Sequence, residues 1–187
     1  MKIKEGAIVK EDAVERAKKV TFVVVDIHGV LTDNTLYYTS QGVKSERFSL
    51  ADKIGFQLLK KAGIKASFLT SKISRADMAV AKIYGLEEEF LWGSSAKMAL
   101  TDEMQKKYGF TDEQMCYIGD EMIDLGMMRR AVLAVAPADA SEEAKQIAHY
   151  VTSCGGGKGV VRELAEFILR AQGKWDDVIA GLIPTGK

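Results

Sequence analysis

The sequence predicts an α/β fold with a doubly wound, mostly parallel sheet and no separate cap domain. Short apolar segments alternate with segments of helical length along most of the 187 residues. The run Phe22–Val25 is β-branched or aromatic throughout, which is typical of a strand buried on both faces. Strands that alternate with helices are parallel and connected by right-handed crossovers. The length allows one well-buried core, so we expect a single domain over residues 1–187.

The elements follow one another regularly after a short amphipathic leader helix, which is expected over Lys10–Lys19. Strands are predicted at Val20–Asp26, Lys65–Thr70, Phe90–Trp92, Met115–Ile118, Leu133–Val135 and Tyr150–Thr152. Helices are predicted at Lys53–Ala62, Ser74–Tyr84, Ala96–Tyr108, Met122–Ala131, Ser141–His149 and Val160–Ala171. The last of these follows a Gly-rich loop, so that loop and helix together span about residues 153–172.

One segment breaks the alternation. Thr35–Leu50 is predicted to form two strands around the Gln41-Gly42 turn, a β-hairpin over about residues 35–50 that stands as a flap beside the preceding loop. Its apolar side chains are more than a lone flap should expose: Leu36, Tyr37, Tyr38, Val43 and Phe48. Packing against another subunit would bury them. The alternative is a monomer whose hairpin folds back over its own sheet.

Composition excludes several classes of partner. Lys plus Arg and Asp plus Glu number 26 each, so no overall charge favours nucleic acid or an anionic membrane. The sequence shows no secretory signal and no apolar run of membrane-spanning length. Cys116 and Cys154 lie far apart without a CxxC pair, which favours a reduced cytoplasmic protein with Cys116 in the core.

Two acidic loops follow predicted strands. Asp26 ends the first strand and Gly29 marks the turn after it, while Asp120 and Asp124 follow the strand Met115–Ile118. The carboxyl ends of parallel strands meet at one sheet edge, where such acids can together hold a divalent cation. Each acid alone could instead cap a turn or a helix. The matched pair of loops favours a functional site.

In order and spacing, these motifs resemble those of the haloacid dehalogenase superfamily, specifically the small 3-deoxy-D-manno-octulosonate 8-phosphate phosphatase family. Asp26–Thr32 is similar to the first motif, Asp-x-Asp-Gly-x-x-[Thr/Ser], except at His28. Thr70 matches the second motif, Lys97 the third, and Gly119–Asp124 the fourth, Gly-Asp-[Asp/Glu]-x-x-Asp. The resemblance implies a Mg²⁺-dependent phosphatase with a HAD-like Rossmannoid core that acts on a small phosphorylated sugar or sugar acid.

The resemblance also implies roles for these residues. Asp26 would be the nucleophile that forms an aspartyl-phosphate. Mg²⁺ would be held by Asp26, Asp120 and the backbone carbonyl of His28, with Asp124 helping through water. Phosphate oxygens would be bound by the groups that match the second and third motifs, namely Thr70, Ser71 and Lys97.

His28 replaces the Asp that protonates the leaving group in the family. An imidazole can perform general acid–base catalysis, but the protonated ring is disfavoured beside Mg²⁺. Three interpretations stay open: an active phosphatase that uses His28, a severely slowed one, and a catalytically impaired binding or assembly subunit. A mutase is disfavoured because no cap domain shields an aspartyl-phosphate.

Other departures fall where the family binds substrate. Ala51–Lys53 replaces the usual Arg-Asp-Gly, and Thr70–Lys72 replaces Thr-Gly-Arg. The candidate substrate-binding residues are Asp52, Lys53 and Lys72, although capping of the following helix is the favoured role for Asp52.

Gly155–Gly159 is not a nucleotide-binding P-loop, because Gly159 stands where that motif needs a hydroxyl. The segment resembles the family's C-terminal loop, which covers a neighbouring subunit's site. By that resemblance Lys158 and Arg162 would reach a neighbouring site within a homotetramer.

Overall fold

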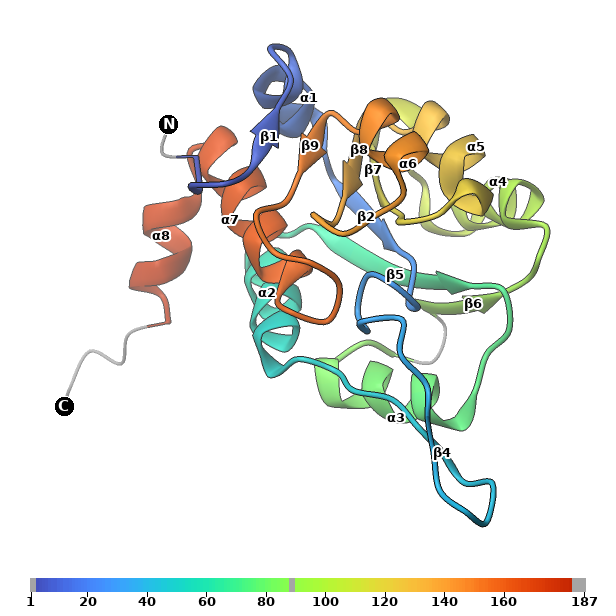
Figure 1. Cartoon of the computed structure of the whole chain (residues 1–187). Coiled ribbons are helices and arrows are strands. Elements are labelled where there is room, and N and C mark those ends of the chain that lie inside the picture. The colour runs from blue at the N-terminus through green and yellow to red at the C-terminus, as the bar shows by residue number, and fades with distance from the viewer. Residues whose placement is uncertain (1–2, 88–89, 183–187) are drawn as a thin grey trace, which may run out of the picture.

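The computed structural model describes residues 3–87 and 90–182 and confirms the predicted α/β class. A seven-stranded sheet lies between two layers of helices (Figure 1). In sheet order its strands are β1 (Ile8–Val9), β9 (Tyr150–Val151), β8 (Leu133–Ala136), β7 (Met115–Ile118), β2 (Phe22–Val25), β5 (Lys65–Thr70) and β6 (Leu91–Gly93). All neighbouring strands are parallel except β1, which pairs antiparallel with β9.

The helices cover both faces of this sheet. They are α1 (Ala13–Lys19), α2 (Leu50–Lys61), α3 (Arg75–Tyr84), α4 (Lys97–Tyr108), α5 (Leu125–Arg130), α6 (Glu142–Ile147), α7 (Val160–Ala171) and α8 (Trp175–Ala180), with single 3₁₀ turns η2 (Asp112–Gln114) and η3 (Met122–Asp124). One apolar cluster joins the sheet to α1, α2, α3 and α7, and a second joins it to α4, α5 and α6. No helix in the described part of the chain is both long and apolar enough to span a bilayer.

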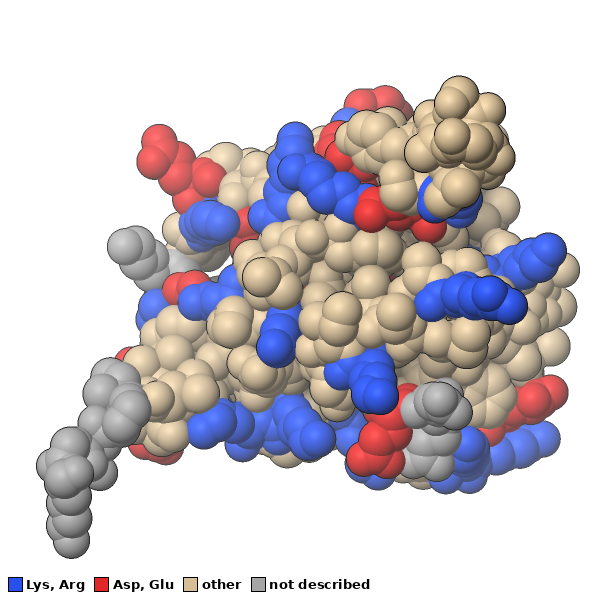
Figure 2. Space-filling view, turned by 90° about the horizontal axis from the view of Figure 1, so that it is seen from below, with Lys and Arg blue, Asp and Glu red and all other residues tan. Residues whose placement is uncertain are grey.

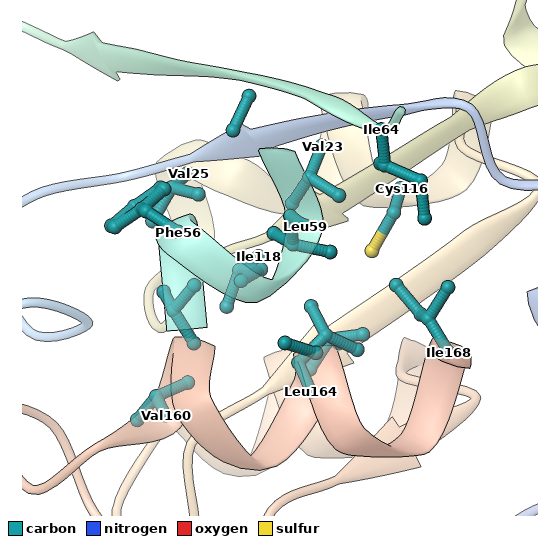
Figure 3. Packing of buried hydrophobic residues seen from close by; sticks show 14 of the residues in the cluster. Val23, Val25, Phe56, Leu59, Ile64, Cys116, Ile118, Val160, Leu164 and Ile168 are labelled. Atoms are coloured by element: carbon teal, nitrogen blue, oxygen red, sulfur yellow. The ribbon is translucent and has the colours of Figure 1, made fainter. Parts of the chain in front are cut away.

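The central strand β2 explains the two-layer packing. Val23 and Val25 belong to the first cluster, whereas Phe22 and Val24 belong to the second, because successive side chains point to opposite faces. All four are at most 1% exposed. Figure 3 shows the first cluster, in which α7 presents apolar side chains to α2 and to the sheet. This buried strand fixes the position of the loop that begins at Asp26.

Some elements differ from the sequence prediction. Strand β1 and helix α8 were not predicted: β1 has two residues and is defined by its pairing with β9, and α8 follows the turn at Gly173. Helix α2 begins three residues earlier than predicted because the Ser49 side chain caps it. The predicted helix Met122–Ala131 is divided into η3 and α5.

The predicted hairpin is present as β3 (Tyr37–Tyr38) and β4 (Lys44–Ser45) and projects from the body of the chain (Figure 1). Tyr38 is 64% exposed and Val43 is 60% exposed, so the tip does not fold back over its own sheet. Phe48, at the base, packs against the first apolar cluster. The base of the hairpin is thus anchored while its apolar tip faces outward.

Candidate active site

The carboxyl ends of β2, β5 and β7 bring the predicted motifs together. β2 pairs with β5 on one side and β7 on the other, so the residues that follow these strands are neighbours. The backbone N–H of Asp26 donates to the carbonyl of Ile118, which joins the first loop to the second. Thr70 ends β5 and is 1% exposed. Three segments far apart in sequence therefore meet at one edge, as predicted.

Three carboxylates form the centre of the site. Oxygens of Asp26, Asp120 and Asp124 lie within 4.8 Å of one another, and the three residues are at most 9% exposed. Burial, reinforced by Asp124, raises the pKa of Asp26 to about 6. Burial, reinforced by Asp26, raises the pKa of Asp120 to about 7. Such crowded oxygens fit a hard divalent cation, which would relieve their repulsion.

Close approach of the two loops depends on Gly29. Its φ is +81°, in the left-handed region, and a Cβ there would overlap the carboxylate of Asp120. The glycine thus permits both the turn after Asp26 and the placement of a carboxylate against the backbone of that turn.

Lys97 lies between two of the acids. Its Nζ is 2.9 Å from Oδ1 of Asp26 and 2.7 Å from Oδ1 of Asp124, and the side chain is 4% exposed. Burial opposes the charged form, but the two carboxylates outweigh it, so the pKa of Lys97 is raised. The ammonium is therefore held beside the predicted nucleophile, where an incoming phosphate would need a positive charge.

Both carboxylate oxygens of Asp124 accept hydrogen bonds from donors of this chain. Its Oδ1 also accepts a hydrogen bond from the hydroxyl of Tyr117 at 2.6 Å, and its Oδ2 accepts from the backbone N–H groups of Asp120 and Glu121. This arrangement fits a supporting role toward a metal better than direct ligation. Tyr117 was missed by sequence reasoning, because within the strand β7 it is indistinguishable from an ordinary core residue.

A cavity of about 390 Å³ opens beside this centre. The predicted Thr70, Ser71, Lys72 and His28 line it together with Lys44 of the hairpin, which the sequence did not single out. On the face seen from below, basic side chains are spread among uncharged and acidic ones, with small groups along the edges (Figure 2). The lysines that line the cavity are Lys44 and Lys72.

His28 reaches toward the base of the hairpin. Its side chain is 34% exposed, and Nε2 lies 3.0 Å from Oε1 of Glu46, whose side chain is 3% exposed. Glu46 was also missed by sequence reasoning. The contact depends on how the hairpin returns to the body, which residue spacing does not reveal.

Asp52 and Lys53 lie away from the site, contrary to the prediction that they bind substrate. Asp52 is fully buried, and its Oδ1 accepts a hydrogen bond from the backbone N–H of Val161 at 2.7 Å, so it caps α7 rather than its own helix. Lys53 lines a different cavity, of about 670 Å³, with Phe56 and Tyr84. Neither residue lines the cavity beside Asp26 that holds Thr70 and His28.

The Gly-rich loop Gly155–Gly159 contacts the loop Asp26–Thr32 of its own chain, called the nucleophile loop below after the predicted role of Asp26. The N–H of Gly157 donates to the carbonyl of Val30, and the N–H of Gly156 donates to Oδ1 of Asp139. Lys158 is exposed. Arg162 pairs with Glu166 at 3.2 Å and lies over the Trp175 ring, so it is engaged within its own subunit.

Comparison with known proteins agrees with this geometry. A family model of haloacid dehalogenase-like hydrolases matches residues 89–164. The chain is 34% identical over 160 residues to 3-deoxy-D-manno-octulosonate 8-phosphate phosphatase from Haemophilus influenzae, covering 86% of this chain and 88% of the relative. It is 32% identical over 166 residues to the protein of the same name from Yersinia pestis, covering 89% and 88%.

Solved structures agree as well. One is the 3-deoxy-D-manno-octulosonate 8-phosphate phosphatase from Moraxella catarrhalis in complex with a magnesium ion, a phosphate ion and a KDO molecule. It is 30% identical, covers 92% of this chain and 98% of that chain, and superposes with a TM-score of 0.86. The chain therefore belongs to the 3-deoxy-D-manno-octulosonate 8-phosphate phosphatase family of haloacid dehalogenase-like hydrolases.

Proposed function

We propose that the chain is a Mg²⁺-dependent phosphatase that hydrolyses a small phosphorylated sugar acid through an aspartyl-phosphate on Asp26. The observation that carries this proposal is the placement of a buried Asp26 between Lys97 and the carboxylate of Asp120, at the edge where Thr70 lines a cavity. Magnesium bound by Asp26, Asp120 and the carbonyl of His28 would offset the repulsion between the nucleophile and the phosphate.

The reaction divides into two displacements. A carboxylate oxygen of Asp26 attacks phosphorus, the ester P–O bond breaks, and the imidazolium of His28 gives its proton to the departing alkoxide. His28 then takes a proton from a water molecule that attacks the aspartyl-phosphate. The bond between phosphorus and the Asp26 oxygen breaks, so that phosphate leaves and the Asp26 carboxylate is regenerated. Lys97 and the hydroxyl of Thr70 would stabilise charge on the phosphate oxygens in both steps.

The substrate class follows from the cavity and the relatives. Lys44 and Lys72 line the cavity together with Thr70 and Ser71, and an ammonium group can pair with a sugar carboxylate. The relatives are named for 3-deoxy-D-manno-octulosonate 8-phosphate, which is therefore our first candidate. Because Asp52 and Lys53 lie elsewhere, the expected specificity rests on Lys72 and Lys44.

Phosphate release from this compound and a panel of sugar phosphates, with Mg²⁺ and with EDTA, tests the proposal. We expect Mg²⁺-dependent turnover that Asp26→Asn abolishes and that Asp102→Asn, an exposed acid of α4, leaves intact. Turnover that survives in Asp26→Asn would refute the aspartyl-phosphate.

The second candidate is a catalytically impaired binding or assembly subunit. The contact between His28 and Glu46 favours it, because it draws the imidazole toward the hairpin. A wild-type chain that is inactive on the whole panel, together with an active His28→Asp variant, would favour this second function over the first.

We also propose a homotetramer in the cytoplasm, in which the hairpin tips pack together and the Gly155–Gly159 loop borders a neighbouring site. The exposed Tyr37, Tyr38 and Val43 support the packing, and the free thiols of Cys116 and Cys154 suit a reducing compartment. Light scattering should give four times the chain mass, and Tyr38→Glu should lower it. A monomeric mass at micromolar concentration would refute the assembly.

A further inference from the structure

Three potential metal ligands from separate elements meet beneath the hairpin. His28 lies in the loop after β2, Glu46 directly follows β4, and Asp77 lies in the first turn of α3. One donor atom from each lies within 4.8 Å of the other two. The Glu46 side chain is 3% exposed and Asp77 is fully buried, so this group is distinct from an exposed acidic cluster.

Each carboxylate is anchored through one oxygen, and its other oxygen is buried without a hydrogen bond. Oε2 of Glu46 lies 3.3 Å from Nζ of Lys44, and Oδ2 of Asp77 accepts the backbone N–H of Ser74 at 2.7 Å. Oε1 of Glu46 and Oδ1 of Asp77 are buried and accept no hydrogen bond. Oε1 of Glu46 is 3.0 Å from Nε2 of His28, which makes an ion pair with it when the imidazole is protonated but no hydrogen bond. Two such oxygens are costly to bury unless something positive lies between them.

We propose that His28, Glu46 and Asp77 form a second metal site that takes a transition-metal ion of the Zn²⁺ class. An imidazole nitrogen with two carboxylate oxygens suits Zn²⁺ or Co²⁺, whereas Mg²⁺ prefers oxygen ligands alone. Lys44 and Ser74 hold the outer oxygens and so orient the inner ones, as partners of metal ligands commonly do. His28 also lines the 390 Å³ cavity, from which water can supply a fourth ligand.

Occupation of this site has a consequence for the chain. The ion would fasten the hairpin, through Glu46, to α3 and to the nucleophile loop. It would also remove the imidazole of His28 from proton transfer, so Zn²⁺ should inhibit the Mg²⁺-dependent turnover. Inhibition rests on the proposed function, whereas binding of the ion does not.

Co²⁺ titrated into the full-length chain in excess Mg²⁺ provides the test. Four-coordinate Co²⁺ absorbs visible light strongly and octahedral Co²⁺ in an all-oxygen site absorbs weakly, so a strong band reports the second site. We expect the band at one equivalent in the wild type. Glu46→Gln and Asp77→Asn should weaken Co²⁺ binding by about tenfold or more. Glu142→Gln, an exposed acid of α6, should bind as the wild type does.

Absence of the strong band, or an unchanged affinity in Glu46→Gln, would overturn the proposal in favour of an imidazolium that bridges the two carboxylates. Circular dichroism shows whether Asp77→Asn disturbs the cap of α3. If it does, the Glu46→Gln variant decides the outcome, because the amide has the same shape as the carboxylate that it replaces. Zn²⁺ inhibition is measured separately with the phosphatase assay. Lack of any turnover without Zn²⁺ would refute the proposed function and leave the Co²⁺ result intact.

Discussion

Lys97 joins the two acidic loops, since its Nζ contacts both Asp26, at 2.9 Å, and Asp124, at 2.7 Å. The lysine is the first residue of α4, so one helix end supplies the positive charge between carboxylates from two strand ends. The same ammonium group thus holds the two acidic loops together and places a positive charge beside Asp26.

Replacing Lys97 with Met should therefore affect both catalysis and stability. We expect kcat/KM to fall by about 10²–10³-fold, because a donor to the transferring phosphate is lost. The melting temperature should fall in EDTA and recover in part with Mg²⁺, since a cation can then offset the buried carboxylates. Lys106→Met, at an exposed position of the same helix, is the control. An unchanged kcat/KM would show that Lys97 has only a structural role.

Tyr117→Phe isolates the hydroxyl that supports Asp124. The phenol donates to Oδ1 of Asp124 at 2.6 Å in a fully buried position. We expect the free energy of unfolding, measured with urea, to fall by about 1–3 kcal/mol, since a buried acceptor loses a donor. Tyr37→Phe, whose residue is half exposed in the hairpin, should change stability little. A free energy of unfolding that falls in Tyr37→Phe but not in Tyr117→Phe would contradict this account.

The sequence predicted the site residues that follow strands. Asp26 and Asp120 were singled out because a buried parallel strand has a recognisable pattern and its carboxyl end has a known position in such folds, whereas Thr70 was singled out by its place in the motif order. Lys97 begins a helix and was found by its place in the motif order. These residues depend on local pattern and topology, which the chain displays directly.

The residues that were missed depend on tertiary packing. Tyr117, Glu46 and Asp77 have no local pattern that separates them from core, hairpin or capping residues. Asp52 was expected either to bind substrate or to cap its own helix, but its side chain accepts a hydrogen bond at the N-terminus of α7, 109 residues further along the chain, a contact that residue spacing does not reveal. Strand β1 likewise exists because of its partner β9 rather than its own two residues.

Gly156→Ala should disturb the nucleophile loop. A Cβ at Gly156 would overlap the carbonyl oxygens of Gly29 and Thr32, which cannot move aside as a flexible side chain could. We expect lower stability, by about 1–3 kcal/mol as in overpacking, together with lower kcat. Gly181→Ala meets its nearest atom at 3.6 Å, an ordinary contact, and is the matched control. Equal stability of the two variants would mean that the Gly-rich loop does not pack on the nucleophile loop as described.

The leaving group should reveal the role of His28. A sugar alkoxide needs a proton as it departs, whereas a nitrophenolate is stable without one. His28→Ala should therefore lower kcat/KM for the sugar phosphate by about 10²–10⁴-fold and for p-nitrophenyl phosphate much less. Parallel assays of kcat/KM on both substrates measure the difference, because kcat/KM reports the steps up to departure of the leaving group and not the later attack of water, which both substrates share. Equal losses of kcat/KM on both would assign His28 to positioning or metal binding rather than to protonation of the leaving group.

His149 should make the stability of the chain depend on pH. Its Nδ1 accepts a hydrogen bond from the backbone N–H of Ala134 at 2.9 Å, which requires the unprotonated nitrogen. Burial, assisted by Arg16, lowers the pKa of His149. A lowered pKa in the folded state means that the unfolded chain binds the proton more readily. The contribution of His149 is thus fully present above the ordinary value of about 6.5 and is lost as the pH falls below it.

His149→Asn tests this dependence, because the amide oxygen can accept the same hydrogen bond and does not titrate in this range. Urea unfolding at a series of pH values should show the wild type losing about 1 kcal/mol relative to the variant as the pH falls from 7 toward 5. A difference between the two proteins that stays constant over that interval would mean that His149 keeps its ordinary pKa in the fold.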